Sequence, residues 1–315
     1  MRNDKADGSC LKAPFPYFGG KSKIAEVVWA ALGQPAHYIE PFFGSGAVLL
    51  ARPAYQRGRH TETVCDKDGF IANVWRALQF APDEVARWCD WPVNHADLAA
   101  RKKELIKNEE KLLNNLVENP EWYDAKLAGY WIWAAGCWIG KGLMSINQRP
   151  HIGTAGSGVH GIGQRPHISD AGNGVHAARN TNIYAWFKNL SERLRYVRVV
   201  CGDWTRVCGG EWQTKLGIAG IFLDPPYGVT DRASDIYHHD STEVAAEVMA
   251  WARERGANTT YRIVLAGYEE YQPLLAEGWT QHSWKAGGGY STSSNKNRHR
   301  ETLYFSPHCL KNTLF

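Results

Sequence analysis

The residues best suited to chemistry lie in one short stretch, Asp224-Pro225-Pro226-Tyr227. An apolar run over residues 218–223 precedes it, which is typical of a buried strand in a parallel sheet with Asp224 at its carboxyl end. The two prolines cannot continue a strand ladder, so they make a stiff turn there. A carboxylate, a backbone carbonyl and an aromatic ring are therefore expected together at the sheet edge where ligands bind.

These groups suit an aromatic amine such as adenine N6, which is a poor nucleophile because its lone pair is delocalised into the ring. The Asp224 carboxylate and the Pro225 carbonyl can accept its two N–H groups. This favours a pyramidal nitrogen and frees the lone pair. Tyr227 can stack on the face of the base. The competing interpretation is a plain strand end followed by a proline turn.

A second group of functional residues lies nearer the N-terminus. A strand-like run, 38–40, leads into Phe43-Gly44-Ser45-Gly46, and another strand-like run ends at Asp66. The sequence lacks the third glycine of the dinucleotide fingerprint G-x-G-x-x-G, but two glycines still let a ligand approach the backbone. An acid about twenty residues further on is at the spacing that reaches ribose hydroxyls. A nucleoside-containing cofactor is predicted, and a surface aspartate at a strand end is the alternative.

A third pattern is Phe18-Gly19-Gly20-Lys21, which stands just before a helix expected over residues 24–32. A glycine pair and a lysine at a helix start can hold an anion through exposed N–H groups and a positive charge. A plain N-terminal turn is at least as good an interpretation of this pattern taken alone.

Together these motifs resemble the Dam-type (D12 class) adenine-N6 DNA methyltransferases. The resemblance rests on F-G-G-K, then F-x-G-x-G after an I-E-P strand, then D-P-P-Y, over residues 14–80 and about 195–306. It implies a Rossmann-like α/β methyltransferase sheet, mostly parallel with one antiparallel strand at 301–305, interrupted by a largely helical target-recognition insert. It also implies S-adenosylmethionine as cofactor, DNA as partner, and site-specific methyl transfer to the N6 amine of a flipped adenine, without a metal.

The resemblance also assigns roles to individual residues. Asp224, Pro225, Pro226 and Tyr227 would be catalytic. Asp66 would hold the cofactor ribose, Asp203 would accept the amino group of the cofactor adenine, and Trp204 would pack near that ring. Trp204 stands where the family's G-D-F segment has phenylalanine, a small departure. The full predicted cofactor set is Tyr17, Lys21, Phe43, Gly44, Ser45, Gly46, Asp66, Asp203 and Trp204.

The chain is predicted to divide into a catalytic domain, 13–81 and 195–308, and an inserted target-recognition region, 82–194. In the insert, leucines at 98, 105, 112 and 116, with Ile106 and Leu113 between them, mark an amphipathic helix that ends near Pro120. An apolar segment over 122–139 is expected to be a second helix, buried against the catalytic domain. A further helix is expected over 182–194.

The insert also contains a duplication. Gln148-Arg149-Pro150-His151-Ile152 and a following A-G-S-G-V-H recur as Gln164-Arg165-Pro166-His167-Ile168 and A-G-N-G-V-H. Three interpretations compete: DNA-contacting loops that use Arg149 and Arg165, a self-packed structural insert, and a zinc site of four histidines. The zinc site lacks the cysteine or carboxylate ligands expected at the usual spacing.

Two loops are expected to serve the reaction in the second catalytic segment. The polar residues 228–239 are predicted to form a mobile lid over the base, ahead of a helix over 242–255. The glycine-rich stretch 285–300 suits phosphate contact or a solvated loop equally well. Its candidate DNA-binding residues are Lys296, Arg298 and Arg300.

Composition narrows the class of protein. A chain of 315 residues with a net charge of +4 permits nucleic acid as a partner. Seven cysteines without a C-x-x-C pair argue against a disulfide framework or a zinc site. No signal peptide or bilayer-spanning stretch is expected, so a cytoplasmic location is predicted, in a bacterial or phage-infected cell, with no obligate protein partner. The alternatives are an RNA adenine or cytosine-N4 methyltransferase, and a non-catalytic DNA-binding module.

Overall fold

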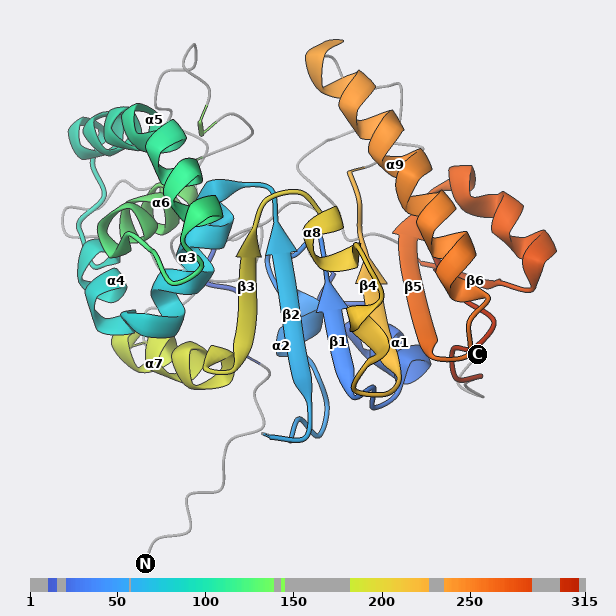
Figure 1. The fold of residues 1–315 in the computed structure, drawn as a ribbon. Helices are drawn as coiled ribbons and strands as arrows, with labels where there is room; N and C mark the ends of the chain where they lie inside the picture. The colour runs from blue at the N-terminus through green and yellow to red at the C-terminus, as the bar shows by residue number, and fades with distance from the viewer. Residues whose placement is uncertain are drawn as a thin grey trace, which may run out of the picture.

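The computed structural model describes residues 11–15, 21–56, 58–138, 143–144, 182–226, 235–284 and 301–311, with the backbone alone at 235–242. At its centre is a seven-stranded sheet with the strand order β3-β2-β1-β4-β5-β7-β6 (Figure 1). The strands are β1 His37–Glu40, β2 Thr61–Asp66, β3 Val197–Cys201, β4 Ala219–Leu223, β5 Tyr261–Gly267, β6 Thr280–Ser283 and β7 Thr302–Phe305.

The direction of the strands confirms the predicted fold class. Strands β1 to β5 pair in parallel, whereas β7 runs antiparallel to both of its neighbours, β5 and β6. Residues 301–305 had been predicted to supply the antiparallel strand, and β7 occupies that place. The result is a mixed α/β sheet of the Rossmann-like methyltransferase type.

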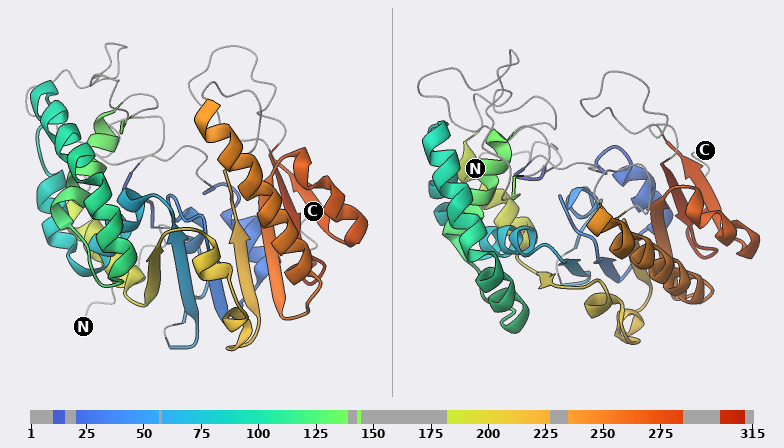
Figure 2. Two further views of the ribbon diagram at one scale, coloured as in Figure 1. Left: turned by 45° about the horizontal axis from the view of Figure 1, so that its top comes forward. Right: turned by 90° about the horizontal axis from the view of Figure 1, so that it is seen from above.

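Helices cover both faces of the sheet and one of its ends (Figures 1 and 2). Helices α1 and α2 lie behind the sheet in Figure 1, α8 and α9 lie in front, and α3 to α7 gather beyond the edge strand β3. Their bounds are α1 Ala25–Leu32, α2 Ala47–Leu50, α3 Gly69–Phe80, α4 Pro82–Cys89, α5 His95–Glu118, α6 Ala125–Cys137, α7 Ile183–Leu194, α8 Thr205–Cys208 and α9 Asp235–Gly256, with 3-10 helices η2 Trp212–Thr214 and η3 Glu269–Glu277.

Strand β4 shows why the sheet is apolar on both faces. Ile221 and Leu223 pack in a cluster with Val248 of α9, while Phe222 points to the opposite cluster. This alternation follows from the two-residue period of a strand. A strand covered by helices on both faces is apolar at every position, which is the pattern that predicted it.

The predicted helices of the middle region are present. Asn94 and Asp124 cap the starts of α5 and α6, each accepting a backbone N–H at 2.8 Å, and Asn182 caps α7 in the same way. Helix α5 buries its leucine stripe and ends at Glu118, with Asn119 as its C-cap residue just before Pro120. Such side-chain caps satisfy N–H groups that the first helical turn leaves unpaired.

The middle helices share one apolar core with the sheet. That core includes Val64 of β2 and Phe222 of β4 as well as Leu105 of α5 and Trp133 of α6. The buried guanidinium of Arg76 joins the two parts, because it donates to Val199 O of β3 and to Leu116 O of α5 at 2.9 and 3.0 Å. The division of the chain at residue 82 stays a prediction.

Two parts of the structure differ from what the sequence predicted. Strand β6 had not been predicted. Helix α9 begins at Asp235, so the predicted helix start at residue 242 is wrong, while a lid role for residues 235–239 stays a prediction. No glycine or proline interrupts residues 235–255, and polarity alone does not prevent a helix. Residues 228–234 of the predicted lid lie outside the described residues.

No helix among the described residues is long and apolar enough to cross a membrane.

Candidate active site

The sheet order sets the place of the candidate active site. Strand β1 pairs in parallel with β2 on one side and with β4 on the other, so the order in which the chain adds strands to the sheet reverses between β1 and β4. Ligands of open α/β sheets bind at such a switch point, beyond the carboxyl ends of the strands. The Phe43–Gly46 turn follows β1 and Asp224 follows β4, so both sequence-predicted motifs meet there.

The Phe43–Gly46 turn needs its glycines. Gly44 and Gly46 have φ values of 47° and 62°, which glycine adopts readily and other residues do not. A Cβ on Gly46 would lie 2.7 Å from the Phe43 ring. Phe43 is buried against Trp75, whose Nε1 donates to Gly44 O at 2.9 Å. The turn is therefore held from beneath by two aromatic rings.

Asp66 lies beside this turn, at the end of β2. Its Oδ2 accepts the Gly44 N–H at 2.8 Å and its Oδ1 accepts the Asp68 N–H at 2.9 Å. Burial and the neighbouring Asp68 raise the pKa of Asp66 to about 7, although these two hydrogen bonds oppose the shift. A carboxylate oxygen can accept a second hydrogen bond, so the arrangement fits two ribose hydroxyls.

Asp203 and Trp204 follow the neighbouring strand β3. The Gly202 N–H donates to Asp66 O at 2.9 Å, which fixes the ends of β2 and β3 against each other. Asp203 Oδ1 accepts the Thr205 N–H and hydroxyl at 3.0 and 2.6 Å. Trp204 is buried and stacks on Phe42, with ring centroids 6.3 Å apart. Trp204 therefore supports the site from below and does not present an open ring.

Asp224, which the sequence predicted to be catalytic, forms an ion pair with Lys21. Their Oδ2 and Nζ atoms are 3.0 Å apart, and the side chains are 21% and 5% exposed. The Lys21 ammonium also lies 5.6 Å from the centre of the Trp284 ring. The sequence predicted both residues in the site but not their pairing, which brings the F-G-G-K lysine directly to the D-P-P-Y aspartate.

Glu40 is a buried acid, sensitive to the Asp224 charge, that the sequence analysis did not single out. Its Oε2 accepts the Tyr38 hydroxyl at 2.9 Å. Burial raises the pKa of Glu40 well above its usual range, and the nearby Asp224 charge adds to this, while the Tyr38 hydrogen bond opposes it. The acid of the I-E-P strand was the available signal, but the sequence does not show that this strand is buried at every position.

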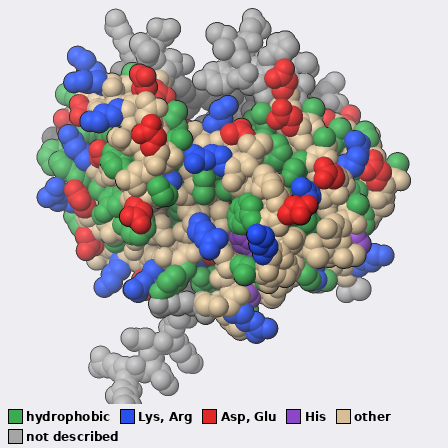
Figure 3. All heavy atoms as spheres, in the orientation of Figure 1, with side chains coloured by type: hydrophobic (Ala, Val, Ile, Leu, Met, Phe, Trp, Pro, Cys, Tyr) green, Lys and Arg blue, Asp and Glu red, His purple; other side chains and the backbone are tan. Residues whose placement is uncertain are grey.

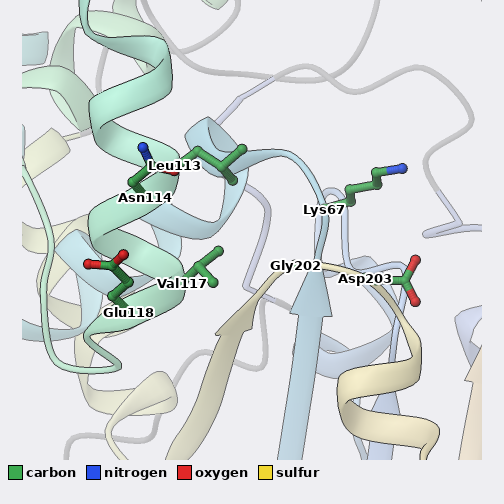
Figure 4. Close-up of a pocket in the computed structure, with 7 residues that line it drawn as sticks. All are labelled: Lys67, Leu113, Asn114, Val117, Glu118, Gly202 and Asp203. Carbon is green, nitrogen blue, oxygen red and sulfur yellow. The ribbon is translucent and has the colours of Figure 1, made fainter.

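A pocket of about 260 Å³ opens at the ends of β2 and β3, next to Asp66 (Figure 4). Residues that follow the two strands form one side of it, and α5 forms the other. Its lining consists of Lys67, Leu113, Asn114, Val117, Glu118, Gly202 and Asp203. Of these residues the sequence analysis predicted Asp203 alone. Lys67 follows Asp66 directly, whereas no sequence signal linked α5 to this place.

Several predicted site residues lie outside the described residues. They are Tyr17, Tyr227, Arg149, Arg165, Lys296, Arg298 and Arg300. The four histidines of the predicted zinc alternative lie there too. Within the described ranges, no three His, Cys, Asp or Glu side chains gather as metal ligands would.

The described residues fit S-adenosylmethionine by their chemistry. A turn of left-handed glycines gives close backbone approach, Asp66 suits ribose hydroxyls, and Asp203 is a hydrogen-bond acceptor one strand further along. Ser45 and Pro225 are buried in the same region, while Pro226 is exposed. These residues follow β3, β2, β1 and β4, which are neighbours in the sheet. A ligand with a base, a ribose and a reactive group in a row could therefore lie along these strand ends.

Residues 17–127 match the family model of D12 class N6 adenine-specific DNA methyltransferase. No curated protein matches the chain. The family match includes the Phe43–Gly46 turn and Asp66, continues through α5 into α6, and ends before β3 and β4. It confirms the resemblance that the sequence motifs predicted, and it indicates an enzyme of the class that methylates adenine in DNA.

Proposed function

We propose that this enzyme transfers the methyl group of S-adenosylmethionine to the N6 amine of an adenine flipped out of DNA, at a specific site. One observation carries the proposal. Asp224 leaves β4 at the switch point, next to the glycine turn after β1, and forms a 3.0 Å ion pair with Lys21. The D12 family match independently supports adenine in DNA as the substrate.

The cofactor would lie along the carboxyl edge of β1, β2 and β3. Phe43, Gly44, Ser45 and Gly46 would hold its amino-acid end, Asp66 its ribose and Asp203 its adenine. When bound, S-adenosylmethionine supplies an activated methyl group. The residues that follow β4 would then face the methyl group from the DNA side.

The target amine would be oriented by the residues that follow β4. The Asp224 carboxylate and the Pro225 carbonyl would accept its two N–H groups, which frees the nitrogen lone pair for attack. Lys21 would keep the carboxylate in position. Tyr227, which lies outside the described residues, is proposed to stack on the flipped base, as in other enzymes that act on extruded nucleotides.

The middle region is proposed to recognise the DNA sequence. Arg149 and Arg165 would contact DNA, and Lys296, Arg298 and Arg300 would contact phosphates; all five lie outside the described residues. The family match crosses residue 82 and continues to residue 127. The proposed division into catalytic domain and recognition insert therefore does not coincide with the end of that match.

Asp224→Asn tests the mechanism, because it keeps the shape of the side chain and removes its charge. We expect the methylation rate on duplex DNA to fall by about a hundredfold or more, since the lost interaction acts mainly in the transition state. Binding of S-adenosylhomocysteine, measured by calorimetry, should change little. Asp224→Ala should lose at least as much, because it also leaves Lys21 without this partner.

Asp83→Asn is the matched control, because Asp83 is an exposed acid on α4, remote from the switch point. It should methylate DNA at the normal rate. Near-normal turnover by Asp224→Asn would contradict the mechanism. Comparing duplex DNA with RNA as substrate tests the RNA alternative, and mapping N6-methyladenine in a host that lacks adenine methylation gives the target site.

A further inference from the structure

Helix α5 carries a second apolar stripe that faces a pocket. Leu112 and Leu116 are buried at 1% exposure, but their neighbours Leu113 and Val117 are 38% and 40% exposed. Residues four apart lie on the same side of a helix, and both side chains line the pocket at the ends of β2 and β3 (Figure 4). An exposed apolar pair inside a pocket is suited to contact with a ligand.

The pocket is continuous with the residues proposed to hold the cofactor. Its opposite wall contains Lys67, next to Asp66, and Asp203. A Cβ on Gly69 would lie 3.4 Å from the Leu113 side chain, so Leu113 packs against the turn that follows Asp66. If Asp66 holds the ribose of a nucleoside, the base attached to that ribose would therefore lie close to Leu113.

Arg206 contacts both walls of the pocket. Its Nη1 donates to Cys201 O at 2.6 Å and its Nη2 donates to Val117 O at 3.5 Å, so it links the end of β3 to α5. Gly202 has a φ of 130°, and a Cβ there would lie 2.8 Å from Arg206 Cδ. The buried Arg76, which donates to Val199 O of β3 and to Leu116 O of α5, also links α5 to the strand ends.

The size and charge of the pocket indicate which class of ligand it can bind. Whole small-molecule sites are roughly 300–1,000 Å³, so a pocket of about 260 Å³ suits part of a ligand. Its lining has two acids, Glu118 and Asp203, against one base, Lys67, which disfavours a phosphate. Apolar side chains with acceptors at the rim suit a neutral heterocycle that carries an amino group.

We infer that α5 forms the apolar wall of the subsite for the purine ring of S-adenosylmethionine, through Leu113 and Val117, facing Asp203. The inference rests on the proposed function and extends it. Helix α5 belongs to the predicted recognition insert, so the cofactor would lie between that region and the catalytic sheet. Leu113 and Val117 are then positioning residues for the cofactor.

Calorimetry of the full-length chain tests the inference with two probes, S-adenosylhomocysteine and 5′-methylthioadenosine. The second probe keeps the purine and ribose but lacks the amino-acid end. The double variant Leu113→Ala/Val117→Ala should bind both probes about tenfold more weakly, because apolar contact with the ring is lost. An equal loss for the two probes places the effect at the purine end.

Two further variants complete the design. Leu216→Ala is the matched control, because Leu216 is a leucine that is 58% exposed outside this pocket, and it should bind normally. Val117→Thr keeps the side-chain shape, so it should fold normally and bind both probes more weakly.

If the unaltered chain binds S-adenosylhomocysteine but the double variant and Val117→Thr bind equally well, the inference is overturned and the proposed function stands. If the unaltered chain does not bind it, the proposed function itself is overturned.

Discussion

Asp66 is held between opposing influences on its charge. Burial and Asp68 raise its pKa from the ordinary value of 3.8 to about 7, while the N–H groups of Gly44 and Asp68 favour the charged form. Because its pKa is raised by folding, the folded state binds a proton more strongly, and stability from this group is lost as the pH rises from about 4 to about 7. The site therefore maintains an acid that is only partly ionised near neutrality.

This charge state predicts a pH dependence of cofactor binding. A charged carboxylate accepts ribose hydroxyls more strongly than a neutral one, so binding should favour the ionised form and release a proton. Below pH 7 the Kd for S-adenosylhomocysteine should rise by up to about tenfold per pH unit, and above pH 8 it should be constant. Calorimetry in buffers of different ionisation heat measures both the Kd and the proton release.

Asp66→Asn is the control for this pH dependence, because it cannot ionise. The Kd of Asp66→Asn for S-adenosylhomocysteine should be higher than that of the unaltered chain and nearly independent of pH. Asp66→Ala should raise the Michaelis constant for S-adenosylmethionine by roughly tenfold or more. The Michaelis constant for DNA should change little. A flat pH profile in the unaltered chain would exclude a charged Asp66 from ribose binding.

Single residues of the site could be predicted from type and spacing, but their contacts could not. Asp66 and Asp224 each follow a short apolar run, which places them at strand ends. The 3.0 Å pairing of Lys21 with Asp224 joins residues far apart in the chain, and the pKa of Glu40 depends on burial that arises only when the sheet is covered. Such properties belong to the assembled structure.

At the scale of the elements, the sequence predicted the strands and helices that have an apolar pattern and missed those that lack one. Strands β1, β2 and β4 and the antiparallel strand β7 were predicted near their observed bounds. The missed strand β6 reads Thr-Gln-His-Ser, lies at the sheet edge and is largely exposed. An edge strand without apolar alternation leaves no periodic signal. Val117 likewise was not among the apolar residues by which α5 was predicted.

Helix α7 is joined to the sheet by a buried ion pair. Arg193 donates to Glu62 Oε2 at 2.6 Å and to Glu62 Oε1 and Leu49 O at 2.9 and 2.8 Å. Glu62 is fully buried in β2 and also pairs with Arg52 at 3.2 Å. The chain thus returns from the middle region to β3 through a contact with β2, the strand that ends in Asp66.

Arg193→Ala should destabilise the protein, because it removes a partner from a buried carboxylate. Because Arg52 still pairs with Glu62, we expect the free energy of unfolding to fall by about 1.5–3 kcal/mol. Urea unfolding followed by circular dichroism measures this. Arg253→Ala is the matched control, since its pair with Glu277 is 40% exposed on both sides, and should cost about 1 kcal/mol or less. Equal losses in the two variants would show that α7 is not held by this pair.

At the scale of the whole molecule, the charges on the face that carries α8 and α9 do not mark that face as a DNA-binding surface (Figure 3). Figure 3 shows side chains of both charges scattered over the face that carries α8 and α9. The net charge of +4 is modest as well. Affinity for DNA depends largely on clustered positive charge, so the arginines of the duplicated segment remain the strongest candidates, on sequence grounds, for reading the target.

Arg149 and Arg165 occupy equivalent positions in the duplication, each followed by proline. If one of them contacts a phosphate, its change to alanine should weaken binding to all sequences and lower the salt slope by about one. If it reads guanine, as we expect for at least one, the change should cost about 1–3 kcal/mol and relax one position of the methylated site. Binding titrations at several salt concentrations, with methylation mapping, separate these outcomes. Arg253→Ala controls for lost charge, and no effect from either arginine would mark the duplication as a structural insert.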